Sequence, residues 1–306
     1  MSAGRDALLS RPAAHFSLHV TVLLWGLTAI LGKAIEVNAF ALVFYRLALV
    51  TVLAAAVMVQ RRDSFRVTTR GFARFALIGS FVAIHWWTFY ACIKVAGVAV
   101  AVICLSTIPF FTALIEPVFF GRRVRASELI IGLLVVAGAV VLVRAETHAS
   151  PFGLALGLGS ALFSAAFGAW NGVVAKEETP ARLTFFELGS AALLNALIFA
   201  VVPASFVAPW ALGARNVGLL LVLAVFCTLL PWLLNVRVLR VLTPFTVAVA
   251  ITLEPVYSVL LAYLVFPQSE RLGLRFYLGA ASLVALVLAN ALVKNRYRAR
   301  SEGAAA

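Results

Sequence analysis

The chain has 306 residues, of which 63% are hydrophobic and only 12% are charged, and its mean hydropathy is +1.05. This composition lies far outside the soluble globular range and indicates a membrane protein. A soluble helical bundle is excluded because too little polar surface would remain to cover it. The net charge of +13 falls in short basic clusters between apolar runs, so we expect no nucleic-acid binding.

The N-terminal region carries Arg5 and Arg11 before its first apolar run, as secretory signal peptides do. That run contains Trp25 and Lys33 and lacks a small-residue cleavage site. We therefore expect it to be retained as a first span.

Ten apolar segments follow one another along the chain, each of a length that suits a bilayer core of about 30 Å. They are residues 18–36, 39–59, 71–93, 96–120, 128–144, 152–174, 183–203, 216–236, 243–266 and 273–293. The predicted fold class is an all-α polytopic membrane protein with ten transmembrane helices.

The charges of the predicted loops indicate the orientation. If both termini lie on the same side, 18 of the 25 Lys and Arg residues fall on that side, 6 fall on the other and Arg46 lies within a span. Basic residues accumulate on the cytoplasmic side of membrane proteins. We expect a multi-pass protein of the cell inner (plasma) membrane with cytoplasmic N- and C-termini.

The chain also contains an internal repeat. A shift of 146 positions, without a gap, places Trp86 over Trp232, Lys94 over Arg240 and Pro109 over Pro255. Each copy has five spans, and because five is odd the second copy must cross the membrane in the opposite sense. Inverted repeats of this kind are typical of transporters that work by alternating access.

The repeat divides the chain into four predicted parts. They are an N-terminal cytoplasmic tail (1–17), a first repeat (18–145), a second repeat (152–293) and a C-terminal cytoplasmic tail (294–306).

Several segments carry a family resemblance by their order and spacing. They are "WGLTAILGK" at 25, "FYRLALV" at 44, "STIPFFTALIEP" at 106 and "LEPVYSVLLAYLVF" at 253. On these segments the chain resembles the EamA-domain members of the drug/metabolite transporter superfamily over nearly its whole length. The resemblance implies two inverted five-helix repeats, a central cavity lined by spans 1 to 4 and 6 to 9, and export of amino acids or other small metabolites.

Glu254 and Pro255 stand in the middle of the ninth predicted span. A carboxylate near the bilayer midplane is costly unless it is protonated, paired or in a water-filled cavity. Pro255 removes a helical hydrogen bond and predicts a bend that leaves backbone carbonyls free beside Glu254. We predict that Glu254 binds a proton or the cationic part of a substrate, and the alternative is a structural salt bridge.

Pro109 is the counterpart of Pro255 in the fourth predicted span. Ser106 and Thr107 precede it, and their hydroxyl groups can either bond the carbonyls that the proline frees or face the cavity. Bonding to the backbone is the favoured interpretation.

Arg46 lies about seven residues into the second predicted span. Its guanidinium could bind a substrate carboxylate with two parallel hydrogen bonds. The alternatives are snorkelling to the outer surface and pairing with Glu36 or another carboxylate.

Aromatic residues recur in the third span, where Trp86 and Tyr90 share one helix face and His85 lies beside them. Together with Trp25 and Trp232, they predict an aromatic wall of the binding cavity. The alternative is the aromatic belt at the outer membrane interface. His85 is either a proton relay or a hydrogen-bonded helix contact.

Glu116 and Glu187 lie nearer the cytoplasmic ends of their predicted spans. For both we favour interfacial ion pairs with nearby basic residues over a role in gating. Trp170 and Asn171 are weaker candidates for the cavity wall.

Motifs of other function classes do not occur. The chain has no Walker A, GxSxG or HExxH sequence, and its three cysteines have no metal-binding spacing. The leading interpretation is a secondary-active exporter of a small metabolite that needs no cofactor or metal. Its predicted partners are a small-molecule substrate, the lipid bilayer and protons as coupling ions, and it acts as a monomer or homodimer. The alternatives are a channel or facilitator and, less favoured, a membrane-embedded enzyme.

Overall fold

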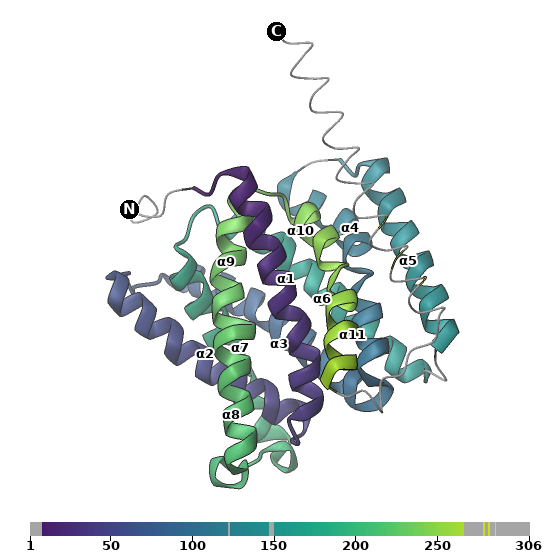
Figure 1. The fold of residues 1–306 in the computed structure, drawn as a ribbon. Helices are drawn as coiled ribbons and strands as arrows, with labels where there is room; N and C mark the ends of the chain where they lie inside the picture. The colour runs from purple at the N-terminus through teal and green to yellow at the C-terminus, as the bar shows by residue number, and fades with distance from the viewer. Residues whose placement is uncertain are drawn as a thin grey trace.

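The computed structural model describes residues 8–121, 123–146 and 150–265, together with 278, 281 and 285. All regular secondary structure in this part of the chain is helical (Figure 1). The main helices are α1 (Arg11–Ala34), α2 (Ala39–Arg61), α3 (Thr69–Leu105), α4 (Ile108–Phe120), α5 (Ala126–Glu146), α6 (Pro151–Val174), α7 (Pro180–Val201), α8 (Gly213–Ala224), α9 (Leu230–Leu239), α10 (Pro244–Ile251) and α11 (Glu254–Val265). The predicted tenth span at 273–293 lies outside the described residues, except for three isolated positions.

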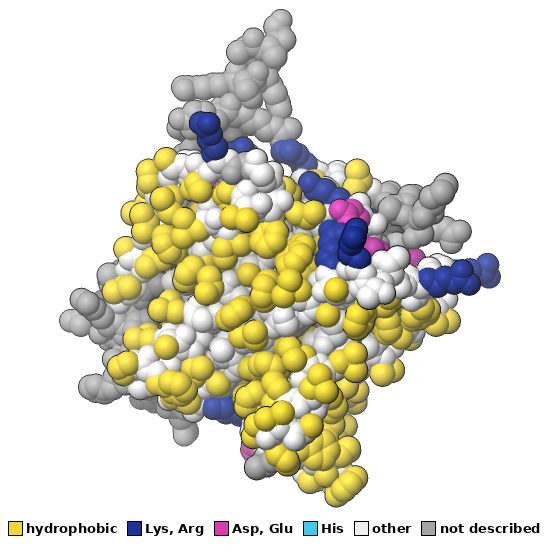
Figure 2. Space-filling view, turned by 180° about the vertical axis from the view of Figure 1, so that it is seen from behind, with side chains coloured by type: hydrophobic (Ala, Val, Ile, Leu, Met, Phe, Trp, Pro, Cys, Tyr) yellow, Lys and Arg dark blue, Asp and Glu magenta, His cyan; other side chains and the backbone are white. Residues whose placement is uncertain are grey.

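Six stretches of the described helices are long and apolar enough to cross a membrane. They are α1, α2, α3, α6, α7 and the continuous run from α8 to α9, in which a π-helical turn at Val225–Leu229 joins the two. Shorter apolar helices include α4 and the first part of α5. Hydrophobic side chains cover the middle of the face shown in Figure 2, as expected for a surface that meets lipid. The protein is therefore a polytopic membrane protein.

The 37-residue helix α3 is divided at Gly97, whose backbone angles are φ +88° and ψ 167°. Glycine adopts a positive φ without the steric cost that a Cβ would impose. A Cβ added here would meet no atom within 4 Å, so the backbone conformation, not the available space, favours glycine. The predicted boundary between the third and fourth spans, at residues 94 and 95, lies three residues too early.

The fourth and ninth predicted spans are each built from two short helices. In the first repeat the break separates residues 98–105 of α3 from α4, and in the second repeat it separates α10 from α11. Both breaks follow the 146-residue repeat, since α4 begins at Ile108 and α11 begins at Glu254.

The break in the second repeat lies between Ile251 and Glu254, immediately before Pro255. A proline disrupts a helix at the residue four positions before it, here Ile251, so the break is where the predicted effect of Pro255 puts it. The helix ends at Ile251, and Pro255 is the second residue of α11, where a helix has no partner for the missing N–H. At the end of α10, Val249 O accepts from Thr252 N at 3.3 Å and from Thr252 Oγ1 at 2.6 Å. Pro109 likewise lies in the first turn of α4.

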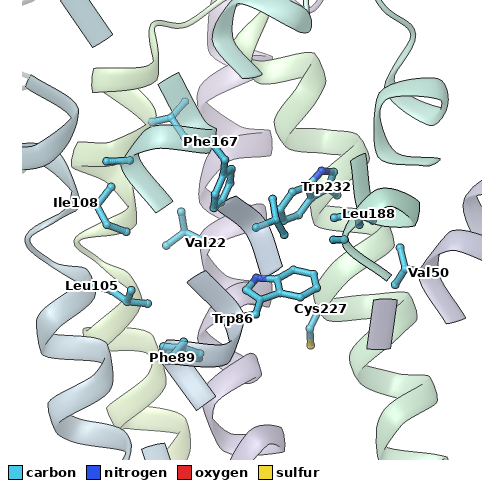
Figure 3. Packing of buried hydrophobic residues seen from close by; sticks show 14 of the residues in the cluster. Val22, Val50, Trp86, Phe89, Leu105, Ile108, Phe167, Leu188, Cys227 and Trp232 are labelled. Carbon is cyan, nitrogen blue, oxygen red and sulfur yellow. The ribbon is translucent and has the colours of Figure 1, made fainter. Parts of the chain in front are cut away.

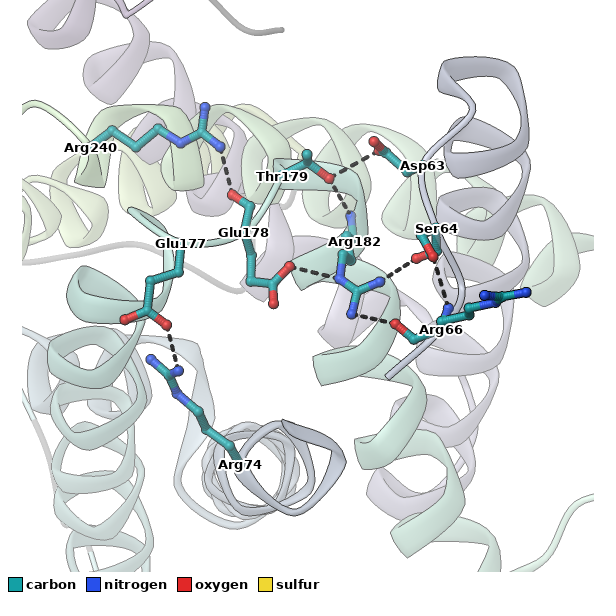
Figure 4. Close-up of polar contacts among 9 residues, drawn as sticks. All are labelled: Asp63, Ser64, Arg66, Arg74, Glu177, Glu178, Thr179, Arg182 and Arg240. Atoms are coloured by element: carbon teal, nitrogen blue, oxygen red, sulfur yellow. Dashed lines mark hydrogen bonds and ion pairs between the residues drawn. The ribbon is translucent and has the colours of Figure 1, made fainter. Parts of the chain in front are cut away.

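Loops that the charge pattern assigns to one side gather at one end of the molecule, which we call the basic end (Figure 4). Arg74 Nη1 lies 2.6 Å from Glu177 Oε2, and Arg240 Nη2 donates to Glu178 O at 2.6 Å. Arg182 donates to the carbonyls of Ser64 and Arg66. The α2–α3, α6–α7 and α9–α10 loops are thereby held together.

At the other end of the molecule, hydrogen bonds and an ion pair connect the α1–α2 loop and the neighbouring residues to the α7–α8 loop. Glu36 Oε1 pairs with Arg215 Nη1 at 2.7 Å, and Asn38 Nδ2 donates to Ser205 O at 2.9 Å. Tyr45 donates to Val207 O at 2.6 Å. We call this the opposite end.

The first helices of the two repeats run in opposite directions. α1 ends at the opposite end, where Lys94 Nζ donates to Ile35 O at 3.0 Å. α6 ends at the basic end, where Arg240 Nε donates to Ala175 O at 2.8 Å. Lys94 and Arg240 are 146 positions apart, and each bonds the carbonyl of the residue that caps the first helix of its repeat.

Candidate functional site

A central cavity lies among helices of both repeats and encloses about 760 Å³, including the part that opens to the outside. Six of the predicted site residues line it: Trp25, Arg46, His85, Trp86, Trp232 and Glu254. These residues come from α1, α2, α3, α9 and α11, so the packing brings together side chains from distant parts of the sequence. The cavity reaches Leu239 and Pro244, which lie near the basic end.

Arg46 is the main cation of the cavity wall, and its residue is only 2% exposed. Its Nε donates to Thr228 Oγ1 at 2.7 Å, Nη1 donates to Tyr90 Oη at 2.7 Å, and Nη2 donates to Cys227 O at 3.2 Å. Its Cζ lies 3.8 Å from the centroid of the Trp86 ring. Three of the five guanidinium N–H donors are thus used, and two remain for other partners.

The alternative interpretations of Arg46 do not fit the structure. Its burial rules out snorkelling to the surface. Glu36 pairs with Arg215 instead, and no carboxylate among the described residues lies within ion-pair distance of Arg46. A buried guanidinium bonded only to neutral groups is costly, and an anionic ligand would offset that cost.

Glu254 is the acidic group of the cavity wall and is 5% exposed. It is the first residue of α11, at the break between α10 and α11. No hydrogen bond or ion pair joins its side chain to another described residue, so the structure gives no support to the alternative interpretation, a structural salt bridge. The first turn of a helix presents unbonded N–H groups and favours an acidic residue.

Three tryptophans form one side of the cavity. The rings of Trp25 and Trp86 each meet Trp232 edge to face, with centroids 6.5 and 5.7 Å away, and Phe167 stacks on Trp232 at 5.6 Å. Figure 3 shows Trp86, Trp232 and Phe167 gathered in the core. Phe167 of α6 was not predicted, because sequence alone does not show which face of α6 meets the cavity.

The interpretation of these aromatic residues as an interface belt is wrong. Trp86 and Trp232 are each 4% exposed, and Tyr90 is fully buried. Tyr90 does not line the cavity but stands behind Arg46 and bonds its guanidinium. It therefore positions the cation.

His85 faces the cavity from α3. Its Nδ1 lies 2.9 Å from Ser160 O and 2.8 Å from Ser160 Oγ. A proton on Nδ1 satisfies both contacts, because the carbonyl can only accept and the hydroxyl proton of Ser160 goes to another acceptor. Ser160 Oγ in turn donates to His85 O at 3.0 Å. The neutral ring then has Nε2 as an acceptor. The helix contact that we considered is present, and the relay role stays a prediction.

Ser106 and Thr107 lie at the break in the first repeat but do not line the cavity. Thr107 Oγ1 donates to Cys104 O at 2.7 Å, which is the backbone bond that we favoured. Ser106 Oγ is buried and makes no hydrogen bond with the described residues, so the same expectation for Ser106 is wrong.

Glu187 forms no interfacial ion pair, contrary to prediction. It is completely buried, and it accepts from Asn171 Nδ2 at 2.9 Å and from Trp232 Nε1 at 3.3 Å. It therefore lies behind the aromatic wall, bonded to neutral donors. Asn171 Oδ1 is buried and has no hydrogen-bond partner in the part of the chain that the structure describes. Trp170, the other weak candidate, packs against Phe81 and Phe119 instead of lining the cavity.

Glu116 is also buried, and it makes a contact between helices. Its Oε2 accepts from Phe245 N at 2.7 Å. Phe245 is in the first turn of α10, where a carboxylate satisfies an otherwise unbonded N–H and the positive end of the helix dipole. Glu116 thus fixes the start of α10 against α4.

Asn235 is a site residue that the sequence analysis missed. It lies on α9 one turn after Trp232, lines the cavity and is 9% exposed, and its Oδ1 has no hydrogen-bond partner among the described residues. A buried amide oxygen without a partner is costly and suits a donor group of a ligand. The spacing of three residues from Trp232 is a signal that could have identified it.

Among the described residues, no group of three or more His, Cys, Asp or Glu side chains could hold a metal ion. The three cysteines are buried free thiols. The cavity therefore offers charge, hydrogen bonding and aromatic surface to a ligand.

Comparisons with known proteins agree with this architecture. The family model of the EamA-like transporter family matches residues 13–144 and 151–291, that is, both repeats. The crystal structure of another protein is similar to this chain, with a TM-score of 0.74 and 18% sequence identity. The match covers 94% of this chain and 99% of that chain. At this identity the likeness shows the fold alone. A search of curated proteins found no match. The chain belongs to the EamA-like transporter family and is a multi-pass membrane transporter of the drug/metabolite transporter superfamily.

Proposed function

We propose that this protein is a secondary transporter that exports a small zwitterionic metabolite, an amino acid with an aromatic or large apolar side chain. The observation that carries the proposal is that Arg46 and Glu254, of opposite charge, line one cavity from different repeats. An amino acid presents a carboxylate to the first and an ammonium group to the second. Each ligand charge would thus offset one protein charge that is costly to bury.

The remaining lining supports the same substrate class. Trp25, Trp86 and Trp232 offer a large apolar surface with ring faces and edges, and aromatic pairs add to the energy of area burial. Asn235 Oδ1 lies in the same wall and could accept from the ammonium group. A purely aliphatic or purely anionic molecule would leave one of these groups unmatched.

Alternating access is the proposed mechanism. Ten spans arranged as two inverted repeats would let the two halves rock about the central cavity. The opposite directions of α1 and α6, and the equivalent breaks before Ile108 and Glu254, support such a symmetry. The cavity reaches toward the basic end, so in this conformation the substrate would enter there. We place that end in the cytoplasm of a cell with the protein in its inner membrane.

Untargeted metabolite profiling of the medium tests the export proposal. Bacteria would overexpress the wild type, Glu254→Gln or, as a matched control, Glu36→Gln, which removes an exposed carboxylate at the opposite end. We expect one class of amino acid to accumulate outside cells with the wild type and the control only. Identical media from all strains and from cells with an empty vector would contradict export of the host's metabolites.

A further inference from the structure

The α7–α8 loop, residues 202–212, exposes large apolar side chains at the opposite end of the molecule. Trp210 is 87% exposed, Val202 is 47% exposed and Phe206 is 46% exposed. Contact of so much apolar surface with water is unfavourable. The side chains of this loop therefore suit an environment that is at least partly apolar.

The apolar surface of the loop continues the apolar outer face of α7. Leu193, Leu197 and Val201 are 60%, 66% and 81% exposed, and because they lie four residues apart they share one face of this helix. In Figure 2 hydrophobic side chains reach the lower tip of the molecule, where Figure 1 shows the beginning of α8. The surface that meets lipid thus extends past the end of α7 into the loop.

Charged groups beside the loop indicate its depth in the membrane. Residues 202–214 contain no charged side chain. Arg215, which follows them directly, pairs with Glu36, and the two side chains are 66% and 72% exposed. Exposed charged groups are costly within the hydrocarbon region and lie at the membrane surface. The loop is therefore at the boundary between lipid and water.

Hydrogen bonds hold the backbone of the loop against the first turns of α2. Asn38 Nδ2 donates to Ser205 O at 2.9 Å, and Tyr45 Oη donates to Val207 O at 2.6 Å. An unbonded carbonyl is costly away from water, so these bonds favour a position of the loop in contact with lipid. The apolar side chains can face lipid while the protein bonds these two backbone groups.

We propose that the α7–α8 loop is a membrane anchor, with Phe206 and Trp210 inserted at the level where the lipid headgroups meet the acyl chains. Tryptophan is enriched at this level because its ring is apolar and its N–H can bond polar groups. The partner is the lipid surface itself. Because the loop also bonds α2, the anchor would hold helices of both repeats at one membrane level. The proposal does not depend on which substrate the central cavity takes.

Spin labelling of the protein in phosphatidylcholine vesicles tests the proposal. Phe206→Cys and Trp210→Cys would each carry a nitroxide, and its collisions with oxygen, which concentrates in lipid, would be compared with those with a water-soluble nickel complex. Leu193→Cys is the matched control on the lipid-facing side of α7, and Arg215→Cys is the matched control at the water-exposed ion pair. The natural cysteines are buried, and the unsubstituted protein gives their background labelling.

We expect the ratio of oxygen collisions to nickel collisions to be highest at position 193, intermediate at 206 and 210, and lowest at 215. A ratio at 206 and 210 as low as that at 215 would place the loop in water and overturn the proposal. Protection of both labels from both reagents would also overturn it, because a second copy of the chain or another protein would then cover the loop.

The natural tryptophan gives a second measurement that needs no label. Trp210→Phe removes one of six tryptophans, so the difference between the emission spectra of the wild type and this variant is the emission of Trp210. We expect phosphatidylcholine brominated in its acyl chains to quench this emission, and aqueous acrylamide to quench it less. Quenching by acrylamide alone would contradict insertion of Trp210.

Discussion

Arg46 in α2 and Glu187 in α7 occupy equivalent places in the two repeats. Arg46 comes seven residues after Ala39, the first residue of α2, and Glu187 comes seven residues after Pro180, the first residue of α7. Each contacts the tryptophan of its own repeat, since Arg46 lies over Trp86 and Glu187 accepts from Trp232. The two tryptophans are themselves 146 positions apart.

Arg46 and Glu187 differ in their access to the cavity. Arg46 lines the cavity, whereas Glu187 is hidden behind Trp232 and bonded to neutral donors. The backbone is thus repeated while the chemistry is not, and the acidic group of the cavity comes from Glu254 at the helix break instead. A symmetric scaffold can move symmetrically and still present a cation on one wall and an anion on the other.

Arg46→Lys would test the role of the guanidinium group in the cavity and should have the largest effect on export. Lysine keeps the charge but cannot bond Thr228, Tyr90 and Cys227 in the same fixed plane and still present donors to a carboxylate. Loss of a buried charge contact costs about 2 to 5 kcal/mol, so the rate of export at low substrate should fall at least about thirtyfold. Export of the compound found by medium profiling would be measured at matched expression.

A matched control for this variant is Arg215→Lys, which alters an exposed arginine at the opposite end. It should export at the wild-type rate. Export by Arg46→Lys within twofold of the wild type would show that guanidinium geometry is not used.

Glu254→Gln would test the acidic group that has no equivalent in the first repeat. Position 108 there is isoleucine. Glutamine keeps the size but not the charge, and a hydrogen bond to a charged group contributes about 1.5 to 3 kcal/mol. Substrate affinity in a binding assay should therefore fall about tenfold to a hundredfold. An unchanged affinity would place the ammonium group of the substrate elsewhere.

Glu187 should matter for stability, and two substitutions distinguish its role. Glu187→Leu leaves Trp232 Nε1 and Asn171 Nδ2 without their acceptor, so the free energy of unfolding should fall by about 1 to 3 kcal/mol. Glu187→Gln still accepts with its amide oxygen, and its NH₂ group can donate to Asn171 Oδ1, which none of the described residues bonds in the wild type. Thermal unfolding should therefore give a Tm for Glu187→Gln no lower than that of the wild type.

The opposite result would be equally informative. A large loss of export in Glu187→Gln with an unchanged Tm would show that the buried carboxylate takes part in transport. Arg46 and Glu187 would then not differ in function as we infer.

Lys94 and Arg240 should give the smallest effects, with the larger one at Arg240, because Arg240 Nη2 also donates to Glu178 O at 2.6 Å. Each donates to the carbonyl of a helix-capping residue, Ile35 or Ala175, at opposite ends of the molecule. A cation at a helix C-terminus contributes about 0.3 to 1 kcal/mol. Lys94→Met and Arg240→Met should each lower the Tm slightly, and a large loss from only one of them would show that the ends are not equivalent.

Features that depend on local sequence could be predicted. The apolar runs, the 146-residue repeat and the aromatic candidates Trp86 and Trp232 follow from hydropathy and internal alignment, and Trp86 and Trp232 indeed line the cavity. Arg46 could be singled out because an arginine within a span is rare and costly.

Features that depend on packing could not be predicted. Thr252 and Leu253 bond back to Val249 and Ala250 at the end of α10, and these capping bonds do not follow from the position of Pro255 alone. Glu187 was assigned to an ion pair from its depth along the helix, but Asn171 and Trp232 come from other helices and decide its partners. Phe167 was missed for the same reason.

Substrate recognition by opposite charges is tested most directly by quenching of tryptophan fluorescence in the purified protein. Trp25, Trp86 and Trp232 line the cavity, so a ligand bound there should change their emission. A panel of aromatic and large apolar amino acids would be compared with the matching amines, which lack the carboxylate, and the matching acids, which lack the ammonium group. We predict saturable quenching by an amino acid and at least about tenfold weaker binding of both analogues. Equal binding of the amino acid and either analogue would contradict the joint role of Arg46 and Glu254.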